Sequence, residues 1–188
     1  MIWRTMLCMA AMAVALGGCG CGGKDDPLDE GTNLEQFFGS NTRVARDRSV
    51  RLQVPVTAPS YPIGGPIELE VFLVNGSKSA RTLPVGMETT QQGAVLTYFS
   101  AAIKAPGGEI KKVTLAPDTV QGDLLTVSLD GYGDTSEKLV LSSYYPFDEA
   151  GTYQVVLFYT VKEGKLPGGS SPEWTGTVWT SPIAIEVE

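Results

Sequence analysis

Four aspartates in the middle of the chain come closest to a reactive or metal-binding set: Asp118, Asp123, Asp130 and Asp134. Two carboxylates could serve as a glycosidase pair, and several could bind calcium. Calcium loops, however, need carboxylates at fixed short offsets that end in a bidentate acid, and that series is missing here. Aspartate beside glycine also stabilises tight turns by bonding its own backbone. We therefore favour turns, predict no metal site and no cofactor, and assign no catalytic residue.

The chain contains no histidine, which excludes Ser-His-Asp and Cys-His hydrolysis and histidine metal sites. No serine lies in a strand-turn-helix elbow, and no glycine-rich phosphate loop with a lysine is present. The 21 acidic residues outnumber the 14 basic ones, and this net charge of −7 argues against a nucleic-acid-binding protein. We predict that the protein is not an enzyme, with a carboxylate-dependent enzyme as the alternative.

The first residues have the three-part layout of a secretory signal. Arg4 precedes an apolar run from Met6 to Leu16, and Gly17 and Gly18 follow. The run is too short to cross a bilayer, which takes about 20 helical residues. A buried core helix is the alternative, but it would not explain the flanking residues. Cys8 falls within this run, and no cysteine follows residue 21, so the predicted domain has no disulfide.

The end of the signal, Leu16-Gly17-Gly18-Cys19, resembles the lipobox of bacterial lipoproteins. The resemblance implies that residues 1–18 are removed as a lipoprotein signal peptide and that acyl chains on Cys19 hold the protein on membrane lipid. Gly20 stands where an aspartate commonly retains Gram-negative lipoproteins in the inner membrane. The expected location is therefore the bacterial cell envelope, with the outer membrane favoured. Cys21 fits the lipobox less well, and a redox or metal site formed with Cys19 is the alternative.

Residues 19–46 are predicted to be the lipidated cysteine and a flexible tether, because glycine and charged residues dominate there. Thr32 and Glu35 have capping-box spacing, which predicts one or two helical turns. Their apolar residues are Leu34, Phe37 and Phe38. We expect these turns to pack on the domain itself, with docking onto a partner as the alternative. Four arginines close the tether, predicted as a solvated strand margin with contact to anionic lipid as the alternative: Arg43, Arg46, Arg48 and Arg51.

From residue 47 to residue 188, apolar and polar residues alternate as they do in β-strands. Strands are predicted over residues 50–56, 67–74, 80–85, 95–104, 110–115, 124–129, 138–142, 152–162 and 181–187. Pro55 indicates that the first is an edge strand, since proline cannot donate a ladder hydrogen bond. Asn75-Gly76 predicts a two-residue type I′ hairpin between the second and third strands. The natural arrangement is an all-β sandwich of two antiparallel sheets.

Residues 147–155, Phe-Asp-Glu-Ala-Gly-Thr-Tyr-Gln-Val, resemble the corner between strands E and F of immunoglobulin-like domains. The resemblance makes Tyr153 the corner tyrosine, whose hydroxyl bonds nearby backbone. Val155 stands where antibody domains place their second cysteine. The likeness is therefore to the disulfide-free immunoglobulin-like sandwiches of bacterial cell-envelope proteins, over residues 47–188.

Aromatic residues of the domain could form a sugar-binding platform, but we predict that they pack the sandwich. Trp174 and Trp179 are expected to face opposite ways from one strand, one in the core and one at a rim. The same packing is predicted for four tyrosines: Tyr98, Tyr144, Tyr145 and Tyr159.

The predicted function is a membrane-anchored bacterial lipoprotein with a non-enzymatic binding or structural module. Its partner would be an unidentified protein or glycan and not a nucleic acid. The alternative is a protease regulator or inhibitor that presents a loop, Ala105 to Gly108 or Leu166 to Pro172, to the enzyme. Four segments resemble small bacterial proteinase-inhibitor domains and the sandwich that precedes some metalloproteases: Ile67 to Asn75, Leu139 to Leu141, Tyr145, and Gly151 to Val155.

Overall fold

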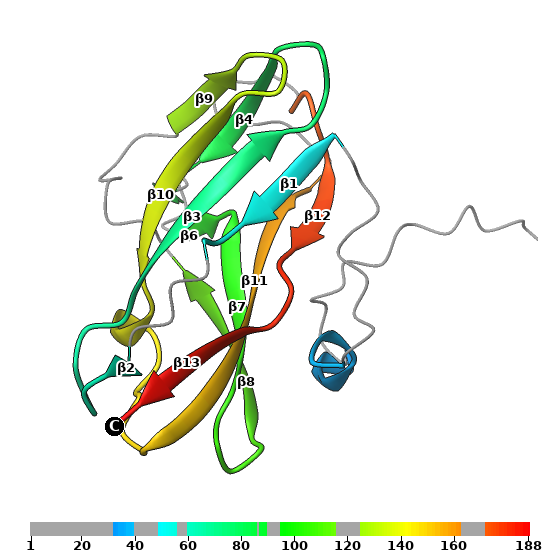
Figure 1. Ribbon diagram of the computed structural model, residues 1–188. Helices are drawn as coiled ribbons and strands as arrows, with labels where there is room; N and C mark the ends of the chain where they lie inside the picture. The colour runs from blue at the N-terminus through cyan, green and yellow to red at the C-terminus, as the bar shows by residue number, and fades with distance from the viewer. Residues whose placement is uncertain are drawn as a thin grey trace, which may run out of the picture.

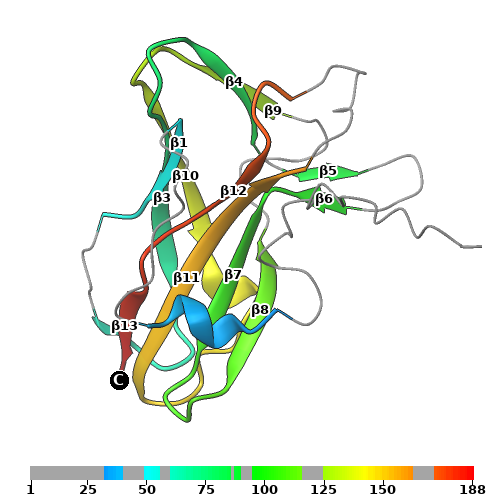
Figure 2. The same ribbon diagram turned by 90° about the vertical axis from the view of Figure 1, so that its right-hand side faces the viewer.

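The computed structural model describes residues 32–39, 49–55, 60–85, 87–89, 95–115, 125–162 and 172–188. These residues contain thirteen strands, two 3-10 helices and no α-helix. Figures 1 and 2 show the two larger sheets stacked as layers, with the pairs β4-β9 and β5-β6 outside them. The structure confirms the prediction of an all-β, immunoglobulin-like two-sheet sandwich. The signal peptide, Cys19 and Cys21 lie outside the described residues.

The first sheet has three antiparallel strands in the order β1-β3-β10. Their bounds are Val50–Gln53 for β1, Glu68–Asn75 for β3 and Asp134–Val140 for β10. Leu52 lies opposite Leu73, and Leu69 lies opposite Leu139, all four within the core. β1 is an edge strand, as Pro55 predicted. It pairs with β3 on one side and with no strand of the sheet on the other.

The second sheet runs in the order β2-β13-β11-β7-β8, and β12 also pairs with β11. The bounds are Ser60–Tyr61 for β2, Phe99–Lys104 for β7, Ile110–Leu115 for β8, Gly151–Val161 for β11, Gly176–Trp179 for β12 and Ile183–Val187 for β13. The residues of β11 from Val155 to Tyr159 are fully buried, so this central strand is covered on both faces.

One strand pair departs from the predicted antiparallel pattern. β2 runs parallel to β13, with Ser60 opposite Glu186 and Tyr61 opposite Val187. β1 and β2 follow each other in the chain, and β1 belongs to the first sheet. The edge of the domain therefore passes from one sheet to the other. β1 is therefore antiparallel to its neighbour β3 in the first sheet, whereas β2 is parallel to its neighbour β13 in the second sheet.

The predicted hairpin at Asn75-Gly76 is wrong. β4 (Arg81–Val85) pairs with β9 (Leu125–Leu129), while β3 pairs with β1 and β10. Neither Asn75 nor Gly76 has the positive φ that a type I′ turn requires. The strand pair β3-β10 instead passes into the pair β4-β9, and the two connecting loops bend together over the top of the sandwich (Figure 2). A further short pair is formed by β5 (Met87–Thr89) and β6 (Val95–Thr97).

Asn75 holds this bend. It is fully buried, and its amide nitrogen donates to the carbonyl oxygens of Ser79 at 2.8 Å, Leu129 at 3.3 Å and Asp130 at 3.0 Å. Its side-chain oxygen accepts from the backbone N–H of Ser77 at 3.0 Å and from the Ser77 hydroxyl at 2.7 Å. The asparagine thus serves as a buried hydrogen-bonding hub, which the turn rule for Asn-Gly does not anticipate.

The loop opposite Asn75 follows the predicted turn chemistry. Tyr132 adopts a φ of 63°, in the left-handed region, and its N–H bonds the Ser77 carbonyl at 2.9 Å. A Cβ on Gly131 would lie 2.0 Å from the Lys78 carbonyl oxygen, so only glycine fits. Asp130 is exposed in this loop, as expected for a turn residue.

Candidate functional site

One wall of the candidate site is a bulge in the second sheet. Between the pairs Phe158-Trp179 and Val155-Ile183, β11 has two residues and the opposing chain has three: Thr180, Ser181 and Pro182. Such an extra residue is a β-bulge, and proline is tolerated at bulges because its nitrogen has no hydrogen to pair. The alternating pattern predicts a strand over residues 181–187, and β12 was not predicted. Pro182 inside that predicted strand was the available signal.

The buried Thr180 side chain repairs the ladder at the bulge. The N–H of Thr180 donates to the Leu157 carbonyl at 3.0 Å, and the Thr180 hydroxyl accepts from the Leu157 N–H at 3.1 Å. Without that hydroxyl, the buried N–H of Leu157 would lose its acceptor. The bulge is therefore a fixed feature of the wall.

The opposite wall is the free side of β1. Gly76 N–H donates to the Ser49 carbonyl at 2.9 Å, which identifies the hydrogen-bonded positions of this antiparallel pair. Because such positions alternate, Arg51 bonds toward β3, and the backbone N–H and C=O of Leu52 point away from it. Val54 lies just beyond the end of β1 and also lines the groove side. Among the described residues, no hydrogen bond reaches the backbone groups of Leu52 on that side.

Between these walls lies a groove of about 640 Å³, which we call the β1 groove. Figure 1 shows β1 beside β12 and the connection to β13. The lining residues are Arg51, Leu52, Gln53, Val54, Pro55, Phe72, Thr180, Ser181, Pro182 and Ile183. The groove is mainly apolar, with two hydroxyls and one amide at its surface. That composition suits the binding of a partially apolar chain.

Arg51 gives the β1 groove its only formal charge. None of the ten lining residues is an acid, a lysine or a cysteine. The Arg51 side chain is exposed, and no ion pair or hydrogen bond joins it to another described residue. The lining thus presents one cation, whose guanidinium can pair with an anionic group.

A second feature lies on the outer face of the second sheet, where the 3-10 helix η1 (Leu34–Phe37) docks. Phe37 is only 4% exposed and contacts the rings of Phe158 and Trp179 at 5.0 and 5.5 Å between centroids. Figure 2 shows η1 lying across β11 and β7. The prediction that these turns pack on the domain itself is confirmed. Docking explains why β11 is buried on both faces.

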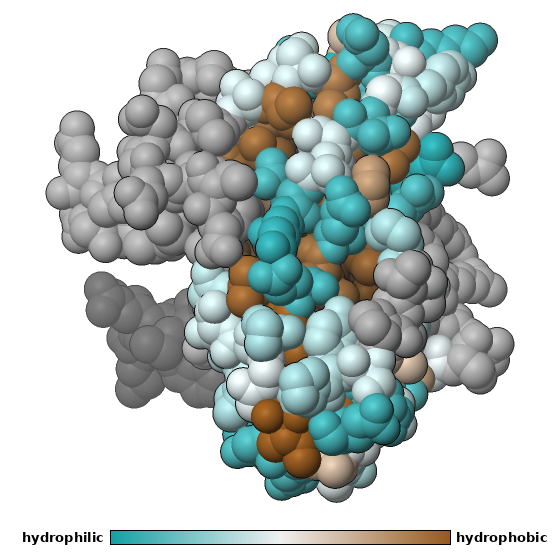
Figure 3. Space-filling model, turned by 60° about the vertical axis from the view of Figure 1, so that its left-hand side comes forward, coloured by the Kyte–Doolittle hydropathy of each residue, from teal (hydrophilic) through white to brown (hydrophobic). Residues whose placement is uncertain are grey.

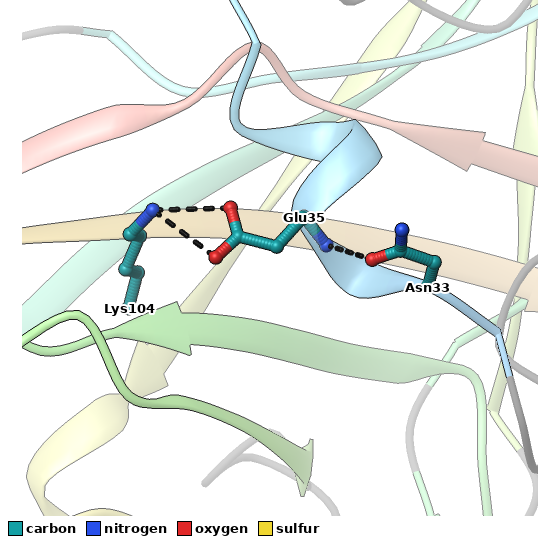
Figure 4. Close-up of polar contacts among 3 residues, drawn as sticks. All are labelled: Asn33, Glu35 and Lys104. Atoms are coloured by element: carbon teal, nitrogen blue, oxygen red, sulfur yellow. Dashed lines mark hydrogen bonds and ion pairs between the residues drawn. The ribbon is translucent and has the colours of Figure 1, made fainter.

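Polar contacts at η1 differ from the predicted capping box. The cap is Asn33, whose side-chain oxygen accepts from the Glu35 N–H at 3.1 Å, and not Thr32 (Figure 4). Glu35 pairs with Lys104 of β7 at 3.1 Å, and the Lys104 ammonium lies 5.8 Å from the Phe38 ring. Glu35 is exposed and Lys104 is partly exposed, so the ion pair contributes little beside the buried Phe37 ring.

The aromatic residues occupy the packing positions expected of them, with one exception, but Trp174 precedes β12 and does not share a strand with Trp179 as predicted. Trp174 stacks on Tyr159 in the main core at 5.8 Å, whereas Trp179 belongs to the separate cluster under η1. Burial and the neighbouring Tyr98 raise the pKa of Tyr159 well above its ordinary value, and its hydroxyl donates to the Pro84 carbonyl at 2.8 Å. The exception is Tyr144, which is exposed.

Tyr153 lies near the start of β11, just after the corner that precedes this strand. Its hydroxyl accepts from the Glu149 N–H and donates to the Glu149 carbonyl, each at 3.2 Å. This is the hydrogen bonding of a corner tyrosine. The Phe147 ring packs edge-on at 4.9 Å. Tyr145 lies nearby, and its pKa is raised by burial first and then by Tyr153 and the acids around it. These contacts serve the fold and give no sign of a ligand site.

The remaining candidate residues are not brought together. Asp118, Asp123 and most of the loop from Leu166 to Pro172 lie outside the described residues. Across the ranges that the structure covers, no three His, Cys, Asp or Glu side chains form a group that could hold a metal. The loop from Ala105 to Gly108 is a tight turn closed by the Gly108 N–H on the Ala105 carbonyl at 2.9 Å.

Hydrophobic residues on one side of the molecule appear as separate patches between hydrophilic side chains (Figure 3). Three large hydrophobic residues are exposed among the described residues: Ile63 in the turn after β2, Tyr132 in the turn before β10, and Tyr144. The portion of the chain with described coordinates has no helix of the length and hydropathy needed to cross a membrane.

No protein-family model and no curated protein matches this sequence. Among solved structures, the chain is similar to an ASH / PapD-like domain of human CEP192, PapD-like domain 7. The identity is 12%, the match covers 75% of this chain and 86% of that chain, and the TM-score is 0.36. The fold assignment for this chain rests on its own strand pairing.

Proposed function

We propose that this chain is a bacterial lipoprotein whose immunoglobulin-like sandwich binds a partner in the cell envelope through the β1 groove. The observation that carries the binding function is the groove between the free side of β1 and the bulge at Thr180 to Pro182. Its lining offers apolar contacts, unused strand hydrogen-bonding groups and one cation, but no base. Such a site holds a ligand without transforming it.

The lipid anchor is the second part of this proposal. The apolar run that ends in Leu16-Gly17-Gly18-Cys19 supports acylation of Cys19, and Gly20 favours the outer membrane. One acyl chain binds membranes only marginally, so two or three chains would make the attachment stable. The anchor would confine the binding module to a membrane surface, where weak binding to a partner on the same surface is effective.

Metabolic labelling with radioactive palmitate in a bacterial host tests the anchor. We expect label on the wild-type chain and on the Cys21→Ser control, and none on Cys19→Ser. Separation of inner and outer membranes by density should place the labelled protein in the outer fraction. An unlabelled wild-type chain, or label that survives Cys19→Ser, would contradict the proposed anchor.

A further inference from the structure

We propose that the β1 groove binds an extended peptide segment carrying an acidic side chain, which adds as a strand to the free side of β1. This inference rests on the proposed binding function and names the chemistry of the partner. The backbone N–H and C=O of Leu52 point away from β3, and Leu52 and Val54 both line the groove. An extended peptide supplies the complementary row of donors and acceptors, because strands pair through alternate residues.

The dimensions of the groove suit a short strand. Residues 51–55 line its length, which is about 17 Å at the rise of an extended chain. The bulge at Thr180 to Pro182 forms the other wall, and Pro182 has no N–H to offer. The second sheet therefore does not supply a complete ladder there, and β1 is the strand that an added peptide would extend.

Side chains of the added strand would alternate between the core side and the outer face. On the core side they meet Leu52 and Ile183, which favours small or branched apolar residues. On the outer face they meet Arg51 and Phe72. A carboxylate beside the Arg51 guanidinium would gain an ion pair that no described residue supplies. The favoured peptide thus alternates apolar residues with polar ones that include an acid.

A second copy of this chain fits the groove less well. Pairing β1 with β1 of another copy would bring a second Arg51 and no carboxylate to the groove.

Long-range electrostatic attraction does not help an acidic peptide to bind, because the protein carries a net charge of −7. Recognition therefore depends on the local Arg51 contact and on the backbone ladder.

The experiment measures anisotropy of a fluorescein-labelled peptide, Thr-Val-Glu-Val-Thr-Val, with the full chain in detergent micelles. We expect Arg51→Glu to weaken binding about tenfold, since an attraction of surface ion-pair size is replaced by a repulsion of similar size. Lys111→Glu is the matched control, because it makes the same charge change on β8 at the far edge of the second sheet and should leave binding unchanged. A peptide with lysine in place of glutamate should bind Arg51→Glu better than wild type.

A second measurement tests strand addition without altering the protein. A peptide N-methylated on one edge keeps its other edge for pairing and should still bind, whereas a peptide N-methylated at every amide should not. Amide shifts in the NMR spectrum should move at Leu52, Val54 and Ile183. Equal binding of both methylated peptides, or the absence of charge-swap rescue at Arg51, would overturn the inference.

Other occupants give distinct outcomes. Concentration-dependent dimerisation that competes with the peptide would identify a second copy of the chain in the groove and overturn the acidic-peptide inference. Shifts at the same amides on adding cell-wall oligosaccharides, with no peptide binding, would also overturn it while leaving a binding function of the groove in place. Because the assay does not depend on acylation of Cys19, its result is separate from that of palmitate labelling.

Discussion

Replacing Asn75 by aspartate tests whether the hydrogen bonds of this side chain hold the bend of the sandwich. The substitution keeps the shape of the side chain but places an oxygen where the amide nitrogen now donates to three carbonyl oxygens at 2.8 to 3.3 Å. Asn75→Ala, which removes all five side-chain bonds, should cost about 3 kcal/mol after partial rehydration. Asn75→Asp should cost at least as much at neutral pH, because it adds a buried charge facing carbonyl oxygens.

This substitution also has a pH signature. Burial and the carbonyl oxygens favour the protonated form, so the pKa of the introduced carboxyl is raised in the folded state above its unfolded value of about 3.9. A group with a raised pKa stabilises the fold relative to the unfolded chain below the unfolded pKa, and that contribution is lost as pH rises. The stability of Asn75→Asp relative to wild type should therefore fall between about pH 4 and pH 7.

Urea unfolding followed by tryptophan fluorescence measures both effects. A loss of about 3 kcal/mol corresponds to a melting temperature lower by about 10 °C for a domain of this size. Asn33→Asp is the control, since the exposed Asn33 side chain only accepts a hydrogen bond and an aspartate can do the same. Equal stability of the two variants, or a cost of Asn75→Asp that does not change with pH, would refute the role assigned to Asn75.

Three further substitutions test other contacts. Thr180→Val should lower the free energy of unfolding by about 2 kcal/mol in urea titrations, because the buried Leu157 N–H loses its acceptor, and Thr180→Ser should restore most of it. Tyr159→Phe should lower the free energy of unfolding by about 1 kcal/mol at pH 7. Because the pKa of Tyr159 is raised in the folded state, wild type should lose stability above about pH 10, and Tyr159→Phe should lose less when urea unfolding is repeated across this pH range. Phe37→Ala should release η1 from the sheet. Amide hydrogen exchange should become faster over residues 34–38, and Trp179 fluorescence should shift to the red. Unchanged exchange would contradict the docking.

Local pattern was sufficient for much of the fold. The strands predicted over residues 67–74, 110–115 and 152–162 appear within a residue or so of those bounds. Alternation of apolar and polar residues with a period of two requires only that one face of a strand be buried, and it can be read directly from the order of residue types. Pro55 likewise indicated an edge strand because a missing N–H is a property of the residue and not of its neighbours.

The β1 groove could not be predicted in the same way. Arg51 was singled out only as a solvated strand margin, and Thr180 to Pro182 were not recognised as a bulge. The two walls come from segments far apart in the chain, and their approach depends on which strands pair. Pro182 within a predicted strand was a usable signal for the bulge, but no local pattern indicated that β1 would face it.

Sequence alone determined the all-β class, the alternation of buried faces, the edge position marked by Pro55 and the exclusion of histidine chemistry, because each follows from residue types and short spacings. The lipidation of Cys19 stays a prediction from the same source. Tertiary structure decided that Asn75 holds a bend and forms no hairpin, that β2 joins the second sheet in parallel, and that η1 covers β11. It also decided the groove beside β1. These outcomes depend on hydrogen bonds and contacts between distant segments, whose partners are chosen only when the two sheets pack together.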